Sequence, residues 1–184
     1  PYYNKPSQEG IYRHFMAVAD ASPVPVIIYN VPGRTGLNMT AATTLRLAHA
    51  TPKIVAIKEA CGNIEQMQAI LDGRPEDFLV LSGDDGITVE LVKRGGDGVI
   101  SVAANAFPER FCGCVHNAMK GNIALAESEI AELTPAIDLL FKEGNPTGVK
   151  SMTAAMGLTR SEVRLPLVEG SISLMEDIKS AITK

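Results

Sequence analysis

One lysine in this sequence follows a short apolar run without interruption. Lys58 comes directly after Ile54-Val55-Ala56-Ile57. If that run is a buried strand, the lysine stem emerges from a poorly solvated place, and desolvation favours the neutral amine. A neutral amine attacks carbonyl groups to form an imine, which then serves as an electron sink. The other interpretation is a lysine that pairs with a carboxylate or extends its ammonium into water at the strand end.

A tyrosine ends the preceding apolar run. Tyr29 follows Val26-Ile27-Ile28, one predicted strand before Lys58. A phenol at the end of a neighbouring strand is able to relay protons to and from an imine nitrogen. A tyrosine that is only hydrogen-bonded at the rim of the core would show the same pattern.

Two loop motifs offer further polar groups. Residues 31–36 read Val-Pro-Gly-Arg-Thr-Gly, and we expect a loop that is stiffened by proline and freed by glycine. A guanidinium of Arg34 held over the strand ends suits bidentate binding of a carboxylate, although a solvent-facing arginine would fit equally well. Residues 82–86 read Ser-Gly-Asp-Asp-Gly, but acidic residues at a helix start need no cation. We therefore expect helix capping there and no metal site.

These residues lie in a regular alternation of short apolar runs and amphipathic stretches. The predicted strands are residues 26–29, 54–57, 78–81 and 98–102, and the predicted helices are 7–21, 40–50, 63–71, 85–94 and 108–120. Such βα units form parallel sheets with right-handed crossovers, whose strands are apolar on both faces. The sheet could be open and doubly wound or part of a closed barrel, but no strand leads into a glycine-rich nucleotide-binding turn. In a barrel the chemistry is found at the carboxyl ends of the strands.

The last third of the chain has no strand signal. We expect an appended helical region, with helices over residues 122–141, 146–156 and 174–182. The expected organisation is therefore a barrel portion over residues 1–121 followed by a helical region over residues 122–184.

Composition excludes several classes of function. The 184 residues carry a net charge of −4 and contain no Trp, so nothing indicates a nucleic-acid groove or an attraction to anionic lipid. No apolar run is long enough to span a bilayer, and the N-terminus lacks the apolar core of a signal peptide. The three cysteines have no paired CxxC spacing, which favours reduced thiols and a cytoplasmic location.

Taken together, the motifs resemble the pyruvate-dependent class I aldolases of the dihydrodipicolinate synthase and N-acetylneuraminate lyase superfamily. The similarity runs over essentially the whole chain. Within the superfamily, the Val-Pro-Gly-Arg-Thr-Gly string at residues 31–36 is similar to that of the synthase branch. The strings that carry it are Pro-Tyr-Tyr-Asn-Lys-Pro at 1–6, Tyr-Asn-Val-Pro-Gly-Arg-Thr-Gly at 29–36, Ile-Lys-Glu-Ala at 57–60, Leu-Ser-Gly-Asp-Asp at 81–85, Gly-Val-Ile-Ser-Val at 98–102 and Asn-Pro at 145–146.

The resemblance implies a (β/α)8 barrel and a role for individual residues. By this resemblance Lys58 forms the imine, Tyr29 relays protons above it, and Arg34 receives the carboxylate of the incoming aldehyde. Tyr3 matches a tyrosine that reaches across a dimer interface into the neighbour's proton relay. Gly83 and Ile100 match positions that line the pyruvate pocket, the latter through its backbone.

The implied reaction is condensation of pyruvate with L-aspartate-4-semialdehyde in lysine and diaminopimelate biosynthesis. It requires no metal and no organic cofactor, because the lysine supplies the electron sink. The implied assembly is a homo-oligomer, either a dimer or a tetramer, and no nucleic acid or membrane is an expected partner. A related aldolase acting on a sugar acid, and a non-catalytic half-barrel, remain as alternatives.

The sequence departs from the family in its extent. Family members begin with four further βα units, so we expect the chain to supply the last four and to be a fragment without activity by itself. The expected missing part includes a Gly-Thr-Thr-Gly-Glu type loop that links the two tyrosines and binds the pyruvate carboxylate. Most of the lysine-feedback pocket is expected there as well, with only Tyr2 in this chain.

Overall fold

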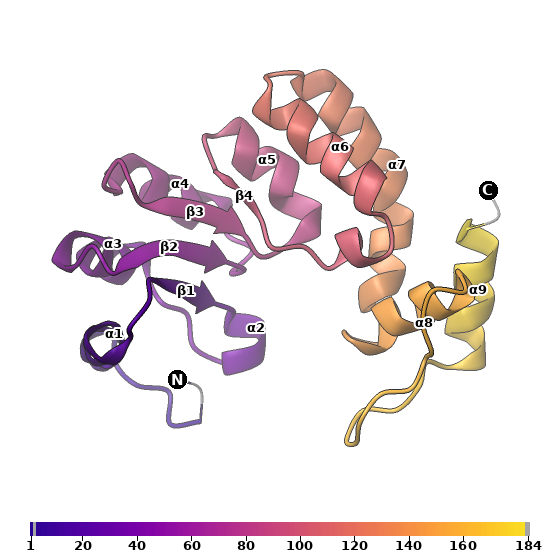
Figure 1. Cartoon of the computed structure of the whole chain (residues 1–184), viewed down its shortest axis with the longest axis horizontal. Coiled ribbons are helices and arrows are strands. Elements are labelled where there is room, and N and C mark those ends of the chain that lie inside the picture. Colours follow the sequence, from indigo (N-terminus) through magenta and orange to yellow (C-terminus); the bar gives the residue numbers. More distant parts are fainter. Residues whose placement is uncertain (2, 183–184) are drawn as a thin grey trace. The chain divides into compact units, whose positions relative to one another are not determined.

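The computed structural model describes residue 1 and residues 3–182, so Tyr2 lies outside the described residues. The chain divides into two compact units, and the division falls between Ile100 and Ser101 (Figure 1). This division differs from the boundary that we expected after residue 121. The helix over residues 108–119 packs on the helix that follows it and so belongs to the second unit. As the limit between the barrel portion and an appended region, residue 121 stays a prediction.

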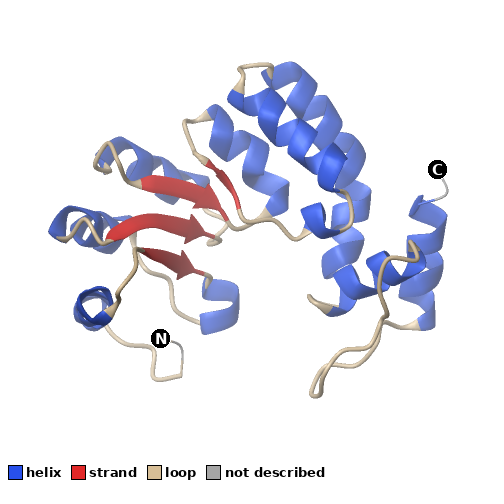
Figure 2. Cartoon of the chain, viewed as in Figure 1, coloured by secondary structure: helices blue, strands red, loops and turns tan. Residues whose placement is uncertain are grey.

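The first unit contains a parallel sheet. Among the described residues its strands are β1 (Val26–Asn30), β2 (Ile54–Glu59), β3 (Leu79–Ser82) and β4 (Gly98–Val99), paired in chain order (Figure 2). The expected strand over residues 98–102 is therefore shorter than predicted. The Ile100 amide still donates to the Ser82 carbonyl at 3.0 Å, but the backbone of Val102 is helical and leads into the 3-10 turn η2 (Ala103–Asn105).

Helices precede β1 and connect the strands of this unit. They are α1 (Gln8–Ala21), α2 (Pro32–Thr35), α3 (Ala41–Ala50), α4 (Ile64–Gly73) and α5 (Thr88–Lys93), with the 3-10 turn η1 (Asp85–Ile87) before α5. Ser7, Thr40, Asn63 and Asp84 each accept a backbone N–H at the start of a helix or turn, and the capping expected within residues 82–86 is confirmed. Segment 31–36 was expected to be a loop and instead contains α2, whose proline supplies a helical φ at the first position.

The helices cover one face of the sheet. Ile28, Ile57 and Val80 point to this face and form a buried core with Leu47 of α3 and Met67 of α4. On the other face Ile27 is 50% exposed, Tyr29 43% and Leu79 43%. Parallel sheets are ordinarily covered on both faces, so the open face is the one that the interior of a barrel would enclose.

The second unit is helical over the described residues. It contains α6 (Pro108–Met119), α7 (Ile123–Phe141), α8 (Thr147–Ala155) and α9 (Ile172–Ile182). These agree with the helices predicted for this part of the chain. No described helix is both long enough and apolar enough to cross a bilayer.

Candidate active site

Lys58 and Tyr29 lie side by side at the carboxyl ends of β2 and β1. They are direct partners in the parallel register, and the Lys58 Nζ atom lies 4.1 Å from the centroid of the Tyr29 ring. Both side chains belong to the open face of the sheet, where Lys58 is half-buried. The structure thus brings together the amine and the phenol that the sequence analysis predicted for imine chemistry.

Gly83 follows β3 and leaves room for the lysine stem. Its amide donates to the Glu59 carbonyl at 2.8 Å and continues the ladder beyond the strand. A methyl group at this position would come 2.8 Å from the Ala60 Cβ and 3.1 Å from the Lys58 Cε. A glycine is therefore required for steric reasons beside the amine.

Arg34 lies on α2, directly beyond the end of β1. The helix ends at Gly36, which adopts a left-handed φ of 70°. The Thr35 hydroxyl donates to the Leu37 carbonyl at 2.9 Å and fixes the exit of the turn. Arg34 itself is exposed. This placement puts a guanidinium on a short rigid turn at the same sheet edge as Lys58 and Tyr29.

Ile100 and Tyr3 are the other two residues that the resemblance assigns to the site. Ile100 follows β4 and is 43% exposed, with its amide on the Ser82 carbonyl. Tyr3 is 85% exposed. The roles expected of both residues stay predictions.

Sequence reasoning missed two buried polar residues next to the site. Asn30 and Glu59, which directly follow Tyr29 and Lys58, are 4% and 0% exposed on the helix-covered face. The signal was present, because an amide and a carboxylate end strands whose other buried positions are apolar. Cys61, which follows them, has a pKa raised to about 11 by burial, and the nearby Glu59 carboxylate adds to the effect.

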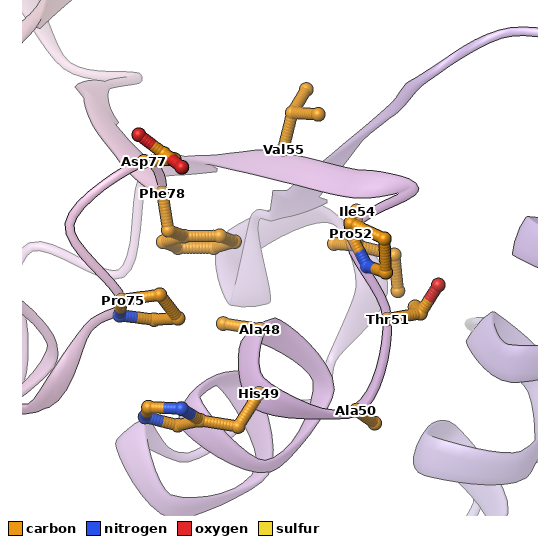
Figure 3. Close-up of a pocket in the computed structure, with 10 residues that line it drawn as sticks. All are labelled: Ala48, His49, Ala50, Thr51, Pro52, Ile54, Val55, Pro75, Asp77 and Phe78. Atoms are coloured by element: carbon orange, nitrogen blue, oxygen red, sulfur yellow. The ribbon is translucent and has the colours of Figure 1, made fainter.

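Two hollows lie at opposite ends of the sheet, and only the smaller one adjoins the candidate site. A hollow of about 420 Å³ lies at the opposite ends of β2 and β3, between Pro52, Pro75 and Phe78 (Figure 3). Barrel chemistry is found at the carboxyl ends of strands, so this hollow is not the candidate site. A small hollow of about 40 Å³ adjoins Tyr29, Asn30 and Thr35 at the carboxyl end. Among residue 1 and residues 3–182, no group of three or more His, Cys, Asp or Glu side chains is arranged to hold a metal ion.

Comparison with known proteins identifies relatives of this chain. The sequence profile of the dihydrodipicolinate synthetase family matches residues 1–184. The 4-hydroxy-tetrahydrodipicolinate synthase of Phocaeicola vulgatus is 52% identical over 184 residues, covering 100% of this chain and 62% of that relative. The dihydrodipicolinate synthase structure from Thermotoga maritima matches with a TM-score of 0.97 at 37% identity, covering 100% of this chain and 63% of that one.

A further solved relative contains a ligand. The chloride-inhibited dihydrodipicolinate synthase from Acinetobacter baumannii complexed with pyruvate matches with a TM-score of 0.95 at 39% identity, covering 100% of this chain and 62% of that one. The chain spans about 62% of the length of the curated relatives it matches.

These matches confirm two expectations. The α/β chain is a set of four βα units of a (β/α)8 barrel followed by helices. The resemblance carried by the strand-end motifs is also confirmed, since the matched profile spans all of them. The chain belongs to the dihydrodipicolinate synthetase family.

Proposed function

We propose that this chain carries the imine-forming lysine of an enzyme that condenses pyruvate with L-aspartate-4-semialdehyde to give 4-hydroxy-tetrahydrodipicolinate, in lysine and diaminopimelate biosynthesis. The observation that carries the proposal is the pair of Lys58 and Tyr29, with the amine 4.1 Å from the ring centroid and Gly83 leaving space for the lysine stem. The pyruvate bound in the Acinetobacter baumannii relative supports the same substrate here.

The chemistry begins on Lys58. Its neutral amine adds to the C2 carbonyl of pyruvate, and loss of water from the carbinolamine leaves an imine. Loss of a C3 proton converts the imine into an enamine, whose C3 forms the new bond to the aldehyde carbon. The aldehyde oxygen gains a proton, and the amino group of the second substrate then displaces Lys58 from the imine carbon to give the cyclic product.

Other residues have supporting roles in this proposal. Tyr29 relays the protons of the imine steps. Arg34 binds the carboxylate of the aldehyde. Gly83 and the backbone of Ile100 line the pyruvate pocket, and Tyr3 completes the relay of a second subunit in a homodimer or homotetramer. No cofactor is needed, because the imine is the electron sink. The expected compartment is the cytoplasm.

Borohydride trapping tests the proposal. The protein expressed from its complete gene is incubated with pyruvate and reduced, and the modified lysine is located by peptide mass mapping. A stable pyruvate adduct on Lys58, absent from a Lys58→Arg variant, is the expected result. A folded protein without an adduct, or with the adduct on another lysine, would overturn the assignment.

The isolated 184-residue chain is proposed to lack turnover. Tyr29 is 43% exposed on an open sheet face, so water would surround the imine and the electrostatic effects of the site would be weakened. Activity of the isolated chain equal to that of the complete gene product would contradict this part of the proposal.

A further inference from the structure

A buried carboxylate lies immediately behind the candidate lysine. Glu59 follows Lys58 in β2, and because successive side chains of a strand alternate, its carboxylate points to the helix-covered face, where it is 0% exposed. A carboxylate without water is costly unless hydrogen bonds satisfy it. An apolar residue would fill the same place in the core at lower cost, so the carboxylate needs an explanation beyond packing.

Three neutral groups donate hydrogen bonds to this carboxylate. The Asn30 amide reaches its two oxygens at 2.9 and 3.0 Å. The Cys61 backbone N–H reaches Oε1 at 2.8 Å, and the Gln66 amide reaches Oε2 at 3.2 Å. The carboxylate therefore joins the end of β1, the turn that leaves β2, and the first turn of α4.

The same network extends to the segment that follows α2. The Asn30 side chain donates to the Asn38 side chain at 2.8 Å and accepts from the Met39 amide at 3.0 Å. Gln66 donates to the Met39 carbonyl at 3.0 Å. Through Asn30 and Gln66, the carboxylate is thus also connected to the segment that follows α2, the helix on which Arg34 lies.

Register ties this network to the site. Asn30 pairs with Glu59 just as Tyr29 pairs with Lys58, so each network residue is covalently next to a site residue. The Glu59 carbonyl also accepts the amide of Gly83 at 2.8 Å. Any slip of β1 against β2 would break the Asn30–Glu59 contacts and change the separation of the amine and the phenol together.

We propose that Glu59 is a positioning residue, whose hydrogen bonds to Asn30 and Gln66 set the position of the Lys58 amine against the Tyr29 phenol. This inference rests on the proposed function. A misplacement of about 1 Å between reacting groups is enough to cost roughly 100-fold in rate. The network therefore acts on turnover through geometry and makes no contact with substrate.

The test is Glu59→Gln in the protein expressed from its complete gene. The new amide group faces the donors of Asn30, Cys61 or Gln66 in place of an acceptor, so the network is broken without a change in volume. Turnover is measured per lysine that borohydride traps with pyruvate, which removes the contribution of unfolded molecules. We expect kcat per trapped site to fall roughly 10- to 100-fold, with the KM for pyruvate changed less than about threefold.

Asp97→Asn is the matched control. Asp97 precedes β4 at the opposite end of the sheet, where its Oδ2 accepts the Val80 amide at 2.8 Å and pairs with Arg74. Loss of this half-buried carboxylate should lower the thermal midpoint while kcat per trapped site stays within about threefold, because the carboxyl ends of the strands are undisturbed.

A milder variant keeps the test decisive if Glu59→Gln does not fold. Gln66→Met removes one donor from the carboxylate and leaves those of Asn30 and Cys61, and kcat per trapped site should fall roughly 3- to 10-fold. If the folded variants lose no more turnover per trapped site than Asp97→Asn, the positioning role is overturned while the imine mechanism stands. If the wild-type protein traps no pyruvate on Lys58, the proposed function itself is overturned.

Discussion

The Lys58 amine lies 4.1 Å from the centre of the Tyr29 ring because the two residues are exact partners across the parallel strands β1 and β2. Parallel strands end at the same edge of a sheet, so the last side chains of neighbouring strands on one face are necessarily close. The pair therefore follows from strand pairing and does not depend on a flexible loop. The variants are made in the protein expressed from its complete gene unless stated otherwise.

Removal of the Tyr29 hydroxyl should separate imine formation from turnover. In Tyr29→Phe the ring beside Lys58 remains, but the proton relay is lost, so turnover should fall roughly 100- to 10,000-fold. Borohydride should still trap pyruvate on Lys58 at long incubation. Tyr12→Phe is the control, because Tyr12 is a half-buried tyrosine of α1 whose ring packs against Arg46. Unchanged turnover in Tyr29→Phe would exclude the relay.

A methyl group on Gly83 should displace the lysine. In Gly83→Ala the new Cβ would lie 3.1 Å from the Lys58 Cε and 3.2 Å from the Glu59 carbonyl oxygen. We expect slower trapping of pyruvate and a loss of about 1–3 kcal/mol in unfolding free energy from overpacking. Gly113→Ala in α6 meets nothing within 4 Å and should fold and react normally. Trapping at the wild-type rate in Gly83→Ala would show that the site tolerates the crowding.

Loss of the Arg34 guanidinium should affect the second substrate only. In Arg34→Ala the pyruvate adduct should form normally, while kcat/KM for aspartate semialdehyde falls about 10- to 100-fold, as expected for a charged hydrogen bond of about 1.5–3 kcal/mol. Arg13→Ala, which removes an exposed arginine of α1, is the control. If the enzyme instead acts on a sugar acid, Arg34→Ala should leave activity with that substrate nearly unchanged.

The start of α9 should show an acid-dependent stabilisation that is testable in the isolated chain. The Leu174 amide donates to the Ser171 hydroxyl, and hydrogen bonds from the Ser171 hydroxyl and amide hold the pKa of Glu143 below its ordinary value of 4.5. A carboxyl group whose pKa is lowered by folding stabilises the fold at pH values above its ordinary pKa. This stabilisation is lost as the pH falls through the lowered pKa. Ser171→Ala should therefore cost about 1 kcal/mol at every pH from the lost cap, and an additional amount at neutral pH that disappears in acid, as measured by urea unfolding. An equal cost at both pH values would contradict the link to Glu143.

The cysteines should react at different rates. Burial raises the pKa of Cys61 from 9.0 to about 11, and the thiolate is the reactive form. Iodoacetamide should therefore label exposed Cys112 well before Cys61 at neutral pH, and labelling of Cys61 should rise about tenfold per pH unit until the pH nears its pKa. Peptide mass mapping of a time course checks the order of labelling. Early labelling of Cys61 would show that the turn after β2 readily exposes this thiol to solvent.

Much of the fold was predictable because it depends on local pattern. The apolar runs that end at Tyr29 and Lys58 predicted neighbouring parallel strands, since βα units place consecutive strands side by side. The caps at Ser7, Thr40 and Asn63 were predictable because each satisfies the free N–H groups of its own helix.

Departures from the prediction arose where neighbouring elements decide. Segment 31–36 closes into α2, and β4 stops after Val99 although the apolar run continues to Val102. The division between the two units falls before α6 because α6 packs on α7, a contact that no local pattern specifies.

The amino-acid sequence alone determined which side chains alternate toward each face near the strand ends, because this alternation is set by a strand's own residues. Only the tertiary structure decided the register that places Tyr29 opposite Lys58, the absence of space for a Cβ at Gly83, and the burial of Glu59 among Asn30, Cys61 and Gln66. The physical reason is that pairing register and hydrogen-bond partners depend on residues distant in sequence, whose positions are fixed only when the sheet and its helices pack together.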